Sequence, residues 1–253
     1  ALCDRVKARV GQAGLYRYHQ MVMLRLIDAF LGGVSHHHYP DAVRELFHAS
    51  FRRILLSIEQ QRKFSYEFSN DSFRKDLGIC RQRLIPAGIQ VLEIAGVPRS
   101  WVLKAGIQDA PRLLRGVAAA GGFRPYFEMH TDRRYLRDFT PAGWRRCYLL
   151  MAELLRMNPT VRGVVASTWW YDPAVSTISP RLRFLREDIE TGGGVFIRLG
   201  EDENATADAV ANSPERHRLY QAGEYRPQRY GVVWPARRLL GYADRLKASG
   251  PGG

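Results

Sequence analysis

The sequence has few cysteines. Its three, Cys3, Cys80 and Cys147, lie far apart along the chain, and none belongs to a C-x-x-C pair. This spacing predicts neither a disulfide framework nor a zinc site, because both need cysteines in paired arrangements. Free thiols are the rule in a reducing cytosol, so we expect a cytoplasmic protein.

Long hydrophobic runs are also missing. A membrane-spanning helix needs about 20 consecutive apolar residues, whereas the most apolar stretch, residues 21–31, is interrupted by Arg25 and Asp28. The first residues do not show the basic and then apolar segments of a secretory signal. We therefore expect no transmembrane segment, and the sequence indicates no particular oligomeric state.

Lysine is scarce as well. Only 5 of the 38 basic residues are lysines, which leaves 38 − 5 = 33 arginines, and the formal net charge is +13. One interpretation is an anionic partner such as nucleic acid, a phospholipid surface or a phosphorylated cofactor. The other is an arginine-rich composition without a partner, because the arginines are spread over almost every segment. A non-enzymatic basic module that binds phospholipid or nucleic acid is therefore one hypothesis for the function.

Residues 1–85 are predicted to form a helical N-terminal segment. Apolar residues recur at helical spacing over residues 15–31, and two glycines follow them. A second helix is expected over residues 41–58. A third is expected over residues 71–80, where Asn70 is a good N-terminal cap.

After residue 86, short apolar strands alternate with helices. Strands are expected at residues 89–94, 126–131, 161–170, 195–199 and 230–234. Helices are expected at residues 111–120, 141–157, 181–190 and 213–223, with a closing helix from residue 235 or 236. The alternation predicts an α/β domain over residues 86–248, with a mixed or mostly parallel sheet covered by helices. Residues 249–253 are expected to be a disordered tail.

The densest group of chemically active side chains is Glu128, His130 and Asp132, at the end of the strand expected over residues 126–131. Alternate residues of a strand share a face, so the three side chains are predicted to project together. A histidine between carboxylates is held in one tautomer and made more basic, as a general base requires. The alternative is an ordinary polar strand end that faces solvent or pairs with arginines.

The H-x-D spelling of His130 and Asp132 also resembles the metal-binding pair of Fe(II)/2-oxoglutarate oxygenases. That family adds a distant histidine and a downstream arginine, and His217 and Arg226 have this order. The resemblance implies an iron site of two histidines and one carboxylate in a double-stranded β-helix. The long helices predicted between the strands favour a different fold, and our first choice includes no metal.

Three arginines, Arg133, Arg134 and Arg137, follow the same strand and precede the helix expected at residues 141–157. A helix N-terminus attracts anions, because its free N–H groups and the helix dipole are positive there. We expect these arginines to hold an anionic carrier.

This order of elements resembles the central unit of the GNAT acyltransferases. In that unit a strand leads through a pyrophosphate loop and a helix to a second strand, which splays from the first. The corresponding pieces are residues 126–131, 133–139, 141–157 and 161–170, within a resemblance that covers residues 88–240. The family's loop reads Arg/Gln-x-x-Gly-x-Gly/Ala, whereas no glycine occurs here before Gly143.

The GNAT resemblance implies a reaction and its participants. The protein would move an acyl group from acyl-CoA or an acyl-carrier-protein thioester to an amine of a small molecule. His130 or Glu128 would deprotonate the amine, and Arg133, Arg134 and Arg137 would hold the carrier.

The stretch over residues 161–170 is apolar on both faces, which predicts a central, buried strand paired with residues 126–131. Its C-terminal end carries Trp169 and Tyr171, and ligands of open α/β sheets bind at that edge. In the GNAT-like interpretation Trp169 lines the acyl pocket, and Tyr171 or Asp172 serves as acid or base. The alternative is that these aromatic residues cap the core of the sheet.

Two other stretches, residues 178–186 and 213–235, resemble segments of a bacterial protein family. This second resemblance implies a bacterial source and no particular activity.

Overall fold

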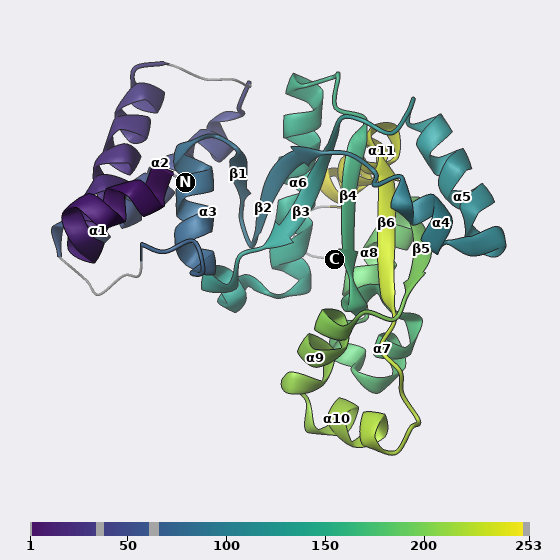
Figure 1. Ribbon diagram of the computed structural model, residues 1–253. Helices are drawn as coiled ribbons and strands as arrows, with labels where there is room; N and C mark the ends of the chain where they lie inside the picture. Colours follow the sequence, from purple (N-terminus) through teal and green to yellow (C-terminus); the bar gives the residue numbers. More distant parts are fainter. Residues whose placement is uncertain (1, 34–37, 61–65, 250–253) are drawn as a thin grey trace. The chain divides into compact units, whose positions relative to one another are not determined.

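A computed structural model describes residues 2–33, 38–60 and 66–249 (Figure 1). By its internal contacts the chain divides into two compact units, residues 1–87 and 88–253.

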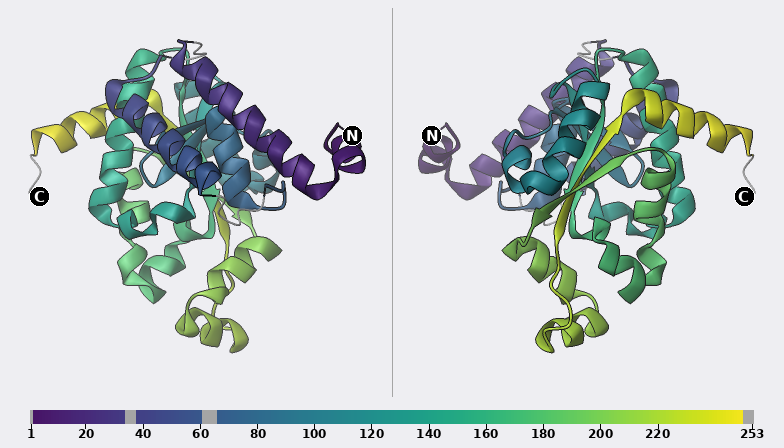
Figure 2. Two further views of the ribbon diagram at one scale, coloured as in Figure 1. Left: turned by 90° about the vertical axis from the view of Figure 1, so that its left-hand side faces the viewer. Right: turned by 90° about the vertical axis from the view of Figure 1, so that its right-hand side faces the viewer.

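The described part of the first unit is mainly helical. Its elements are α1 (Leu2–Leu31), α2 (Asp41–Glu59), α3 (Asp71–Cys80) and the short strand β1 (Leu84–Ala87). The second and third helices are confirmed, and the Asn70 side chain caps α3 by accepting the N–H of Phe73. The first helix begins earlier than predicted, but Gly11 interrupts it with φ 69° and ψ −177°. Only glycine adopts this conformation readily, and a bend near the N-terminal end of α1 is visible in Figure 2.

A six-stranded mixed sheet confirms the predicted α/β class. The strand order is β1-β2-β3-β4-β6-β5. Strands β3 and β4 pair in parallel, whereas the β2–β3, β4–β6 and β5–β6 pairs are antiparallel. The bounds of the last five strands are β2 (Gln90–Ala95), β3 (Tyr126–Thr131), β4 (Gly163–Thr168), β5 (Val195–Gly200) and β6 (Arg229–Pro235). Strand β1 was not predicted, because four residues that include a proline give almost no periodic signal.

The helices of the second unit follow the predicted alternation. They are α4 (Ser100–Lys104), α5 (Gly106–Ala119), α6 (Pro141–Met157), α7 (Pro173–Ile178), α8 (Phe184–Thr191), α9 (Glu203–Ala211), α10 (Pro214–Gln221) and α11 (Ala236–Ala248). Helix α6 matches its predicted bounds, since Thr140 accepts the N–H of Gly143 and Pro141 occupies the first helical position. Helices α4, α7 and α9 were not predicted, because all three are short.

The central strand is β4, as its apolar sequence predicted. Its residues Val164, Val165 and Ala166 are at most 5% exposed, and β4 lies between β3 and β6. The predicted strand was too long by two residues at each end: Val161 and Arg162 precede β4, and Trp169 and Trp170 belong to a 3₁₀ turn at Trp169–Tyr171.

Helices cover the two faces of the sheet differently. On one face, Trp234 of β6 contacts Tyr148 of α6 at 5.0 Å and Tyr242 of α11 at 5.4 Å between ring centroids. On the other face, helices α4 and α5 cover an apolar cluster that includes Trp101, Leu113, Tyr126, Val165 and Val233. The ring of Trp101 lies so close to Gly231 that a Cβ atom there would come within 2.6 Å of it.

The described helices include none that is both long enough and apolar enough to cross a membrane. The predicted disordered tail lies outside the described residues except for Ser249, which forms the C-terminal cap of α11.

Candidate functional site

The parallel strands β3 and β4 pair over only a short distance. Their register contains two residue pairs, Phe127 with Val164 and Glu128 with Val165. By contrast, β3 pairs with β2, and β4 with β6, at six positions each. The two strands therefore separate towards their C-terminal ends (Figure 1), as the GNAT resemblance implied. Ligands of open α/β sheets bind at this edge.

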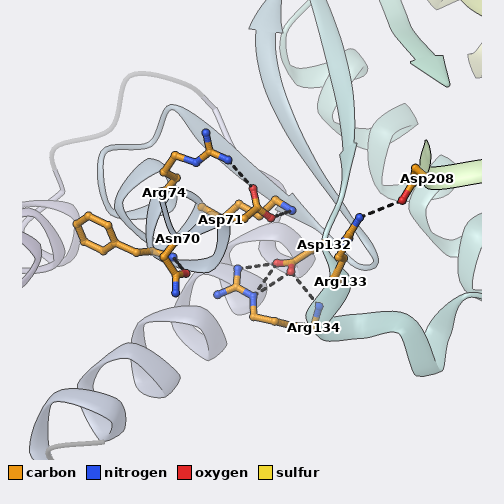
Figure 3. A network of polar contacts seen from close by, with 9 residues as sticks. Asn70, Asp71, Arg74, Asp132, Arg133, Arg134 and Asp208 are labelled. Carbon is orange, nitrogen blue, oxygen red and sulfur yellow. Dashed lines mark hydrogen bonds and ion pairs between the residues drawn. The ribbon is translucent and has the colours of Figure 1, made fainter. Parts of the chain in front are cut away.

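Asp132 lies just beyond the end of β3 and is 2% exposed. Its carboxylate accepts the backbone N–H of Arg134 at 3.1 Å and two side-chain N–H groups, from Nε at 2.9 Å and Nη2 at 2.6 Å (Figure 3). It caps the 3₁₀ segment Arg133–Asp138. The expectation that Asp132 projects together with Glu128 and His130 stays a prediction, and its carboxylate is engaged with Arg134. Arg134 is in turn held by Asp132.

The other two arginines of this segment are exposed. Arg133 is 78% exposed and forms an ion pair of 3.3 Å with Asp208 of α9 (Figure 3). Arg137 is exposed and forms no ion pair with any residue that the structure describes. Asp208 also accepts the indole N–H of Trp169 at 2.9 Å. It thereby links the loop after β3 to the turn after β4, at the edge where these strands separate.

His130 and Glu128 face two residues of β2 across the antiparallel pair. His130 lies opposite Val91, and Glu128 lies opposite Glu93. His130 Nε2 is 3.8 Å from Glu93 Oε2, too long for a hydrogen bond. This nitrogen is buried and has no hydrogen-bond partner among the described residues, although 39% of the side chain is exposed. Two carboxylates directly opposite each other in neighbouring strands repel.

Ser167 of β4 and Arg229 of β6 lie on the same face. Val165 pairs with Glu128, and Ser167 follows two residues later on that face. The Ser167 hydroxyl accepts a hydrogen bond of 2.7 Å from Nη2 of Arg229. Nη1 of Arg229 also forms an ion pair of 3.2 Å with Oδ2 of Asp202. The pKa of Asp202 is lowered, first by the hydrogen bond from the N–H of Ala205 and then by Arg229.

Trp169 is buried, and the guanidinium of Arg216 lies 4.7 Å from its ring. Arg216 is itself 3% exposed and donates to the carbonyl of Ala209 at 2.6 Å and to the Ser179 hydroxyl at 2.7 Å. Burial lowers the pKa of Arg216. Trp169 is thus anchored by its neighbours at the end of β4.

The structure does not bring Tyr171 together with His130. The Tyr171 ring contacts Phe196 at 5.2 Å, and Phe196 pairs with Val232. Successive residues of a strand point to opposite faces, so Phe196 lies on the face opposite to Glu128 and His130. Tyr171 is 1% exposed, and burial raises the pKa of its hydroxyl well above the ordinary value. A role for Tyr171 as acid or base therefore stays a prediction, and it does not involve contact with His130.

The side chain of Asp172 accepts hydrogen bonds from backbone groups nearby. Its carboxylate accepts the N–H groups of Ala174 and Gln228, both at 3.0 Å, and it caps α7. Burial raises its pKa. It ties the residues before β6 to the turn after β4.

The iron-site alternative is not supported by the arrangement of its ligands. No group of three histidine, cysteine or acidic side chains that could hold a metal ion exists among the residues with described positions. Asp132 is engaged with Arg134, and His217 is exposed on α10. The single six-stranded sheet also differs from a double-stranded β-helix.

Many arginine side chains form ion pairs with carboxylates of the same chain. These ion pairs occur in both units and include Arg53–Asp76, Arg145–Asp188, Arg156–Asp244, Arg186–Glu190 and Arg218–Glu215. An anionic partner stays a prediction.

Three residues of this region were missed by the sequence. Glu93 and Asp208 become neighbours of the predicted residues only through strand pairing and tertiary packing, for which the sequence carries no local signal. Arg229 belongs to a stretch in which basic and aromatic residues alternate, and that composition could have indicated it.

Comparisons with known proteins give a likeness of fold. No protein-family model matches the sequence, and neither does any curated protein. Among solved structures, the chain is similar to an acyltransferase in complex with CoA and 10C-teicoplanin. The identity is 13%, 90% of this chain and 67% of that chain are covered, and the TM-score is 0.48. It is also similar to an acyltransferase in complex with decanoyl-CoA, with 13% identity, the same coverage and a TM-score of 0.46.

Proposed function

We propose that this protein transfers an acyl group from a thioester of coenzyme A, or of an acyl-carrier protein, to an amine. The observation that carries the proposal is the separation of β3 and β4 after two residue pairs. Beyond these pairs, the facing edges of the strands offer backbone N–H and C=O groups that need partners. The pantetheine arm of both carriers is an extended chain with amide groups, which suits pairing with strand edges.

The group that would receive a proton from the amine lies beside this gap. Glu93, Glu128 and His130 share one face of the sheet, and His130 lies in the part of β3 that no longer pairs with β4. We assign His130 as the base, because its buried Nε2 has no hydrogen-bond partner in the described chain. The deprotonated amine nitrogen attacks the thioester carbonyl carbon, and the C–S bond then breaks. The departing thiolate takes up a proton, so the amine becomes an amide.

The anionic end of the carrier would lie over the segment between β3 and α6. Arg137 and Arg133 are the exposed arginines there, whereas Arg134 is held by the buried Asp132. Because this segment is a 3₁₀ helix without glycine, arginine side chains would have to replace the backbone cradle of a glycine-rich loop. Breaking the exposed Arg133–Asp208 pair costs little, so Arg133 is available to phosphate.

The test is binding and turnover of acetyl-CoA and of a medium-chain acyl-CoA, with a panel of amines as acceptors. We expect calorimetric binding of acyl-CoA and amine-dependent release of free thiol. Arg137→Gln should weaken binding by about tenfold, a typical value for one charge-assisted contact. The matched control is Arg218→Gln, an exposed arginine on α10 that is paired with Glu215.

Two further ligands separate this proposal from a basic binding module. Duplex nucleic acid and anionic phospholipid vesicles are titrated over a range of salt concentrations. Binding of either one with a steep salt dependence, together with no binding of acyl-CoA, would reject the acyltransferase assignment.

A further inference from the structure

The N-terminal unit contains a cysteine and a histidine in contact. Sγ of Cys3 lies 3.6 Å from Nε2 of His19, although 16 residues separate them in the sequence. Cys3 is partly exposed, whereas His19 is 4% exposed. A thiol beside an imidazole nitrogen is the arrangement that activates nucleophilic cysteines, because the ring accepts the thiol proton.

The break at Gly11 makes this contact. An unbroken helix would place residues 3 and 19 about 24 Å apart along its axis. At Gly11 the backbone leaves the helix with φ 69°, and a Cβ atom there would meet no other atom within 4 Å. Conformational freedom, and not space, is therefore the reason for glycine at this position.

The second nitrogen of His19 fixes the tautomer of the ring. Nδ1 lies 2.8 Å from the carbonyl oxygen of Tyr66. A carbonyl only accepts hydrogen bonds, so Nδ1 carries the proton and Nε2 presents its lone pair to Cys3. The three parts therefore have the order nucleophile, base and orienting group that activated nucleophiles share.

Packing holds the imidazole in place. The rings of Tyr18, Phe68 and Phe73 lie between 5.0 and 5.7 Å from the His19 ring, measured between centroids. The described charged residues on the surrounding segments include Asp4, Arg5, Lys7, Arg17, Glu67, Asp71 and Arg74. Glu67 accepts the hydroxyl of Tyr16 at 2.8 Å.

The other two cysteines have the opposite environment. Cys80 and Cys147 are buried, and burial raises the pKa of their thiols to about 12 and about 11. They stay protonated and shielded at neutral pH. Cys3 is thus the cysteine whose surroundings favour reaction.

We propose that Cys3 and His19 form a site for thiol–disulfide exchange with low-molecular-weight disulfides, which modifies Cys3 reversibly. Nε2 of His19 takes the thiol proton, and the Cys3 thiolate attacks one sulfur of the disulfide. The S–S bond breaks, and the second sulfur leaves as a thiolate that is then protonated. Cys3 is oxidised to a mixed disulfide with one half of the attacked reagent, and the other half of the reagent is reduced to a free thiol. Disulfide exchange needs a proton acceptor for the thiol and access to its sulfur; His19 Nε2 lies beside Sγ, and Cys3 is partly exposed.

The test measures the reaction of the folded chain with dithiodipyridine, an aromatic disulfide whose released thiol absorbs light. At about pH 7 an ordinary cysteine is still mostly protonated whereas an ordinary imidazole is mostly neutral, so base assistance is visible there. We expect one thiol to react fast with the reagent, and peptide mass spectrometry should locate the modification at Cys3. A reducing thiol should remove the modification again. Its rate should exceed that of Cys3 in His19→Gln by about tenfold, since the gain in thiolate is partly offset by lower nucleophilicity.

A second variant keeps the test decisive if His19→Gln fails to fold. Gly11→Ala should slow the reaction of Cys3 by a similar factor, because alanine disfavours the positive φ that brings Cys3 and His19 together. The matched control is Gly32→Ala at the other end of α1, where φ is ordinary and a Cβ meets only backbone oxygens at 3.4 and 3.5 Å. Its rate should equal the wild-type rate. A Cys3 that reacts no faster than a cysteine in an unstructured peptide would overturn the proposal, and so would wild-type rates in both His19→Gln and Gly11→Ala.

Discussion

The two faces of the sheet in residues 88–253 are filled by different kinds of side chain. The face under α6 and α11 is packed with large aromatic rings, such as Trp234 against Tyr148. The face under α4 and α5 is apolar from β5 to β4, but at β2 and β3 it carries Glu93, Glu128 and His130. The first face holds the fold together, whereas the second combines stability with a patch of titratable groups.

This difference indicates where substitutions can be made without unfolding the protein. Side chains of the aromatic face are buried among one another, so each truncation leaves a cavity. The polar patch is partly exposed, with 39% of the His130 side chain and 25% of the Glu93 side chain accessible. Side chains that are partly exposed in this way are accessible to a substrate.

The largest expected effect is on turnover. If His130 is the base, His130→Ala should lower the rate of acyl transfer by about 10²–10⁴-fold, because general-base assistance is lost. The unfolding midpoint in urea should change little. His217→Ala, an exposed histidine on α10, is the control and should retain full activity. A loss of stability without a loss of activity would make the polar patch an ordinary strand end.

The next largest effect concerns the aromatic face. Trp234→Ala should lower the free energy of unfolding by about 3–5 kcal/mol, because it removes a fully buried ring and leaves a cavity. Urea titration followed by circular dichroism measures this change. Phe68→Ala, at a position that is 50% exposed, should cost far less. Equal losses from the two substitutions would contradict the assignment of this face as the main stabilising core.

A smaller effect is expected at Asp208, which joins the ends of the two diverging strands. Asp208→Asn removes the exposed ion pair with Arg133 but leaves an oxygen for the Trp169 N–H, so it should cost less than about 1 kcal/mol. Asp208→Ala removes both contacts and should cost about 1–2 kcal/mol more, since the indole N–H loses its partner. Thermal unfolding of the two variants distinguishes these contributions. Identical melting temperatures would show that Asp208 does not hold Trp169.

The smallest effect is the pH dependence contributed by Asp172. Burial raises the pKa of this carboxyl above its ordinary value of 3.8, so the folded protein holds the proton more tightly than the unfolded chain does. The resulting stability is fully present below pH 3.8 and is lost as pH rises through the folded-state pKa. Asp172→Asn removes this titration. The difference in unfolding free energy between wild type and variant should therefore change across this window and be flat well above it.

The ends of the elements were predictable where a local signal exists. Strand β3 matches its predicted residues. Helix α6 does so as well, because Thr140 and Pro141 mark its start clearly. Asp132 is a cap as well, and its position before Arg133–Asp138 was a readable signal that the alternation argument overrode. Helix α9 was missed, since its short, weakly amphipathic sequence gives little periodicity.

The candidate site was predictable only in part. The resemblance implied that β3 and β4 diverge, and the paired register agrees. The proximity of Glu93 to His130 depends on the register between β2 and β3, and that register follows from packing over the whole sheet. The separation of Tyr171 from His130 was not predictable either, because it depends on the 3₁₀ turn that follows β4.

The position of β6 has a consequence for how the protein is made. Strand β6 lies between β4 and β5 and is the last strand of the sheet along the chain. While a ribosome synthesises residues 163–228, β4 and β5 have no common neighbour, and their edges stay open to unwanted pairing. Completion of the sheet must wait for residues 229–235 to emerge and insert between strands made earlier. Such long-range closure slows folding, so the order of synthesis delays the final sheet until its last strand is made.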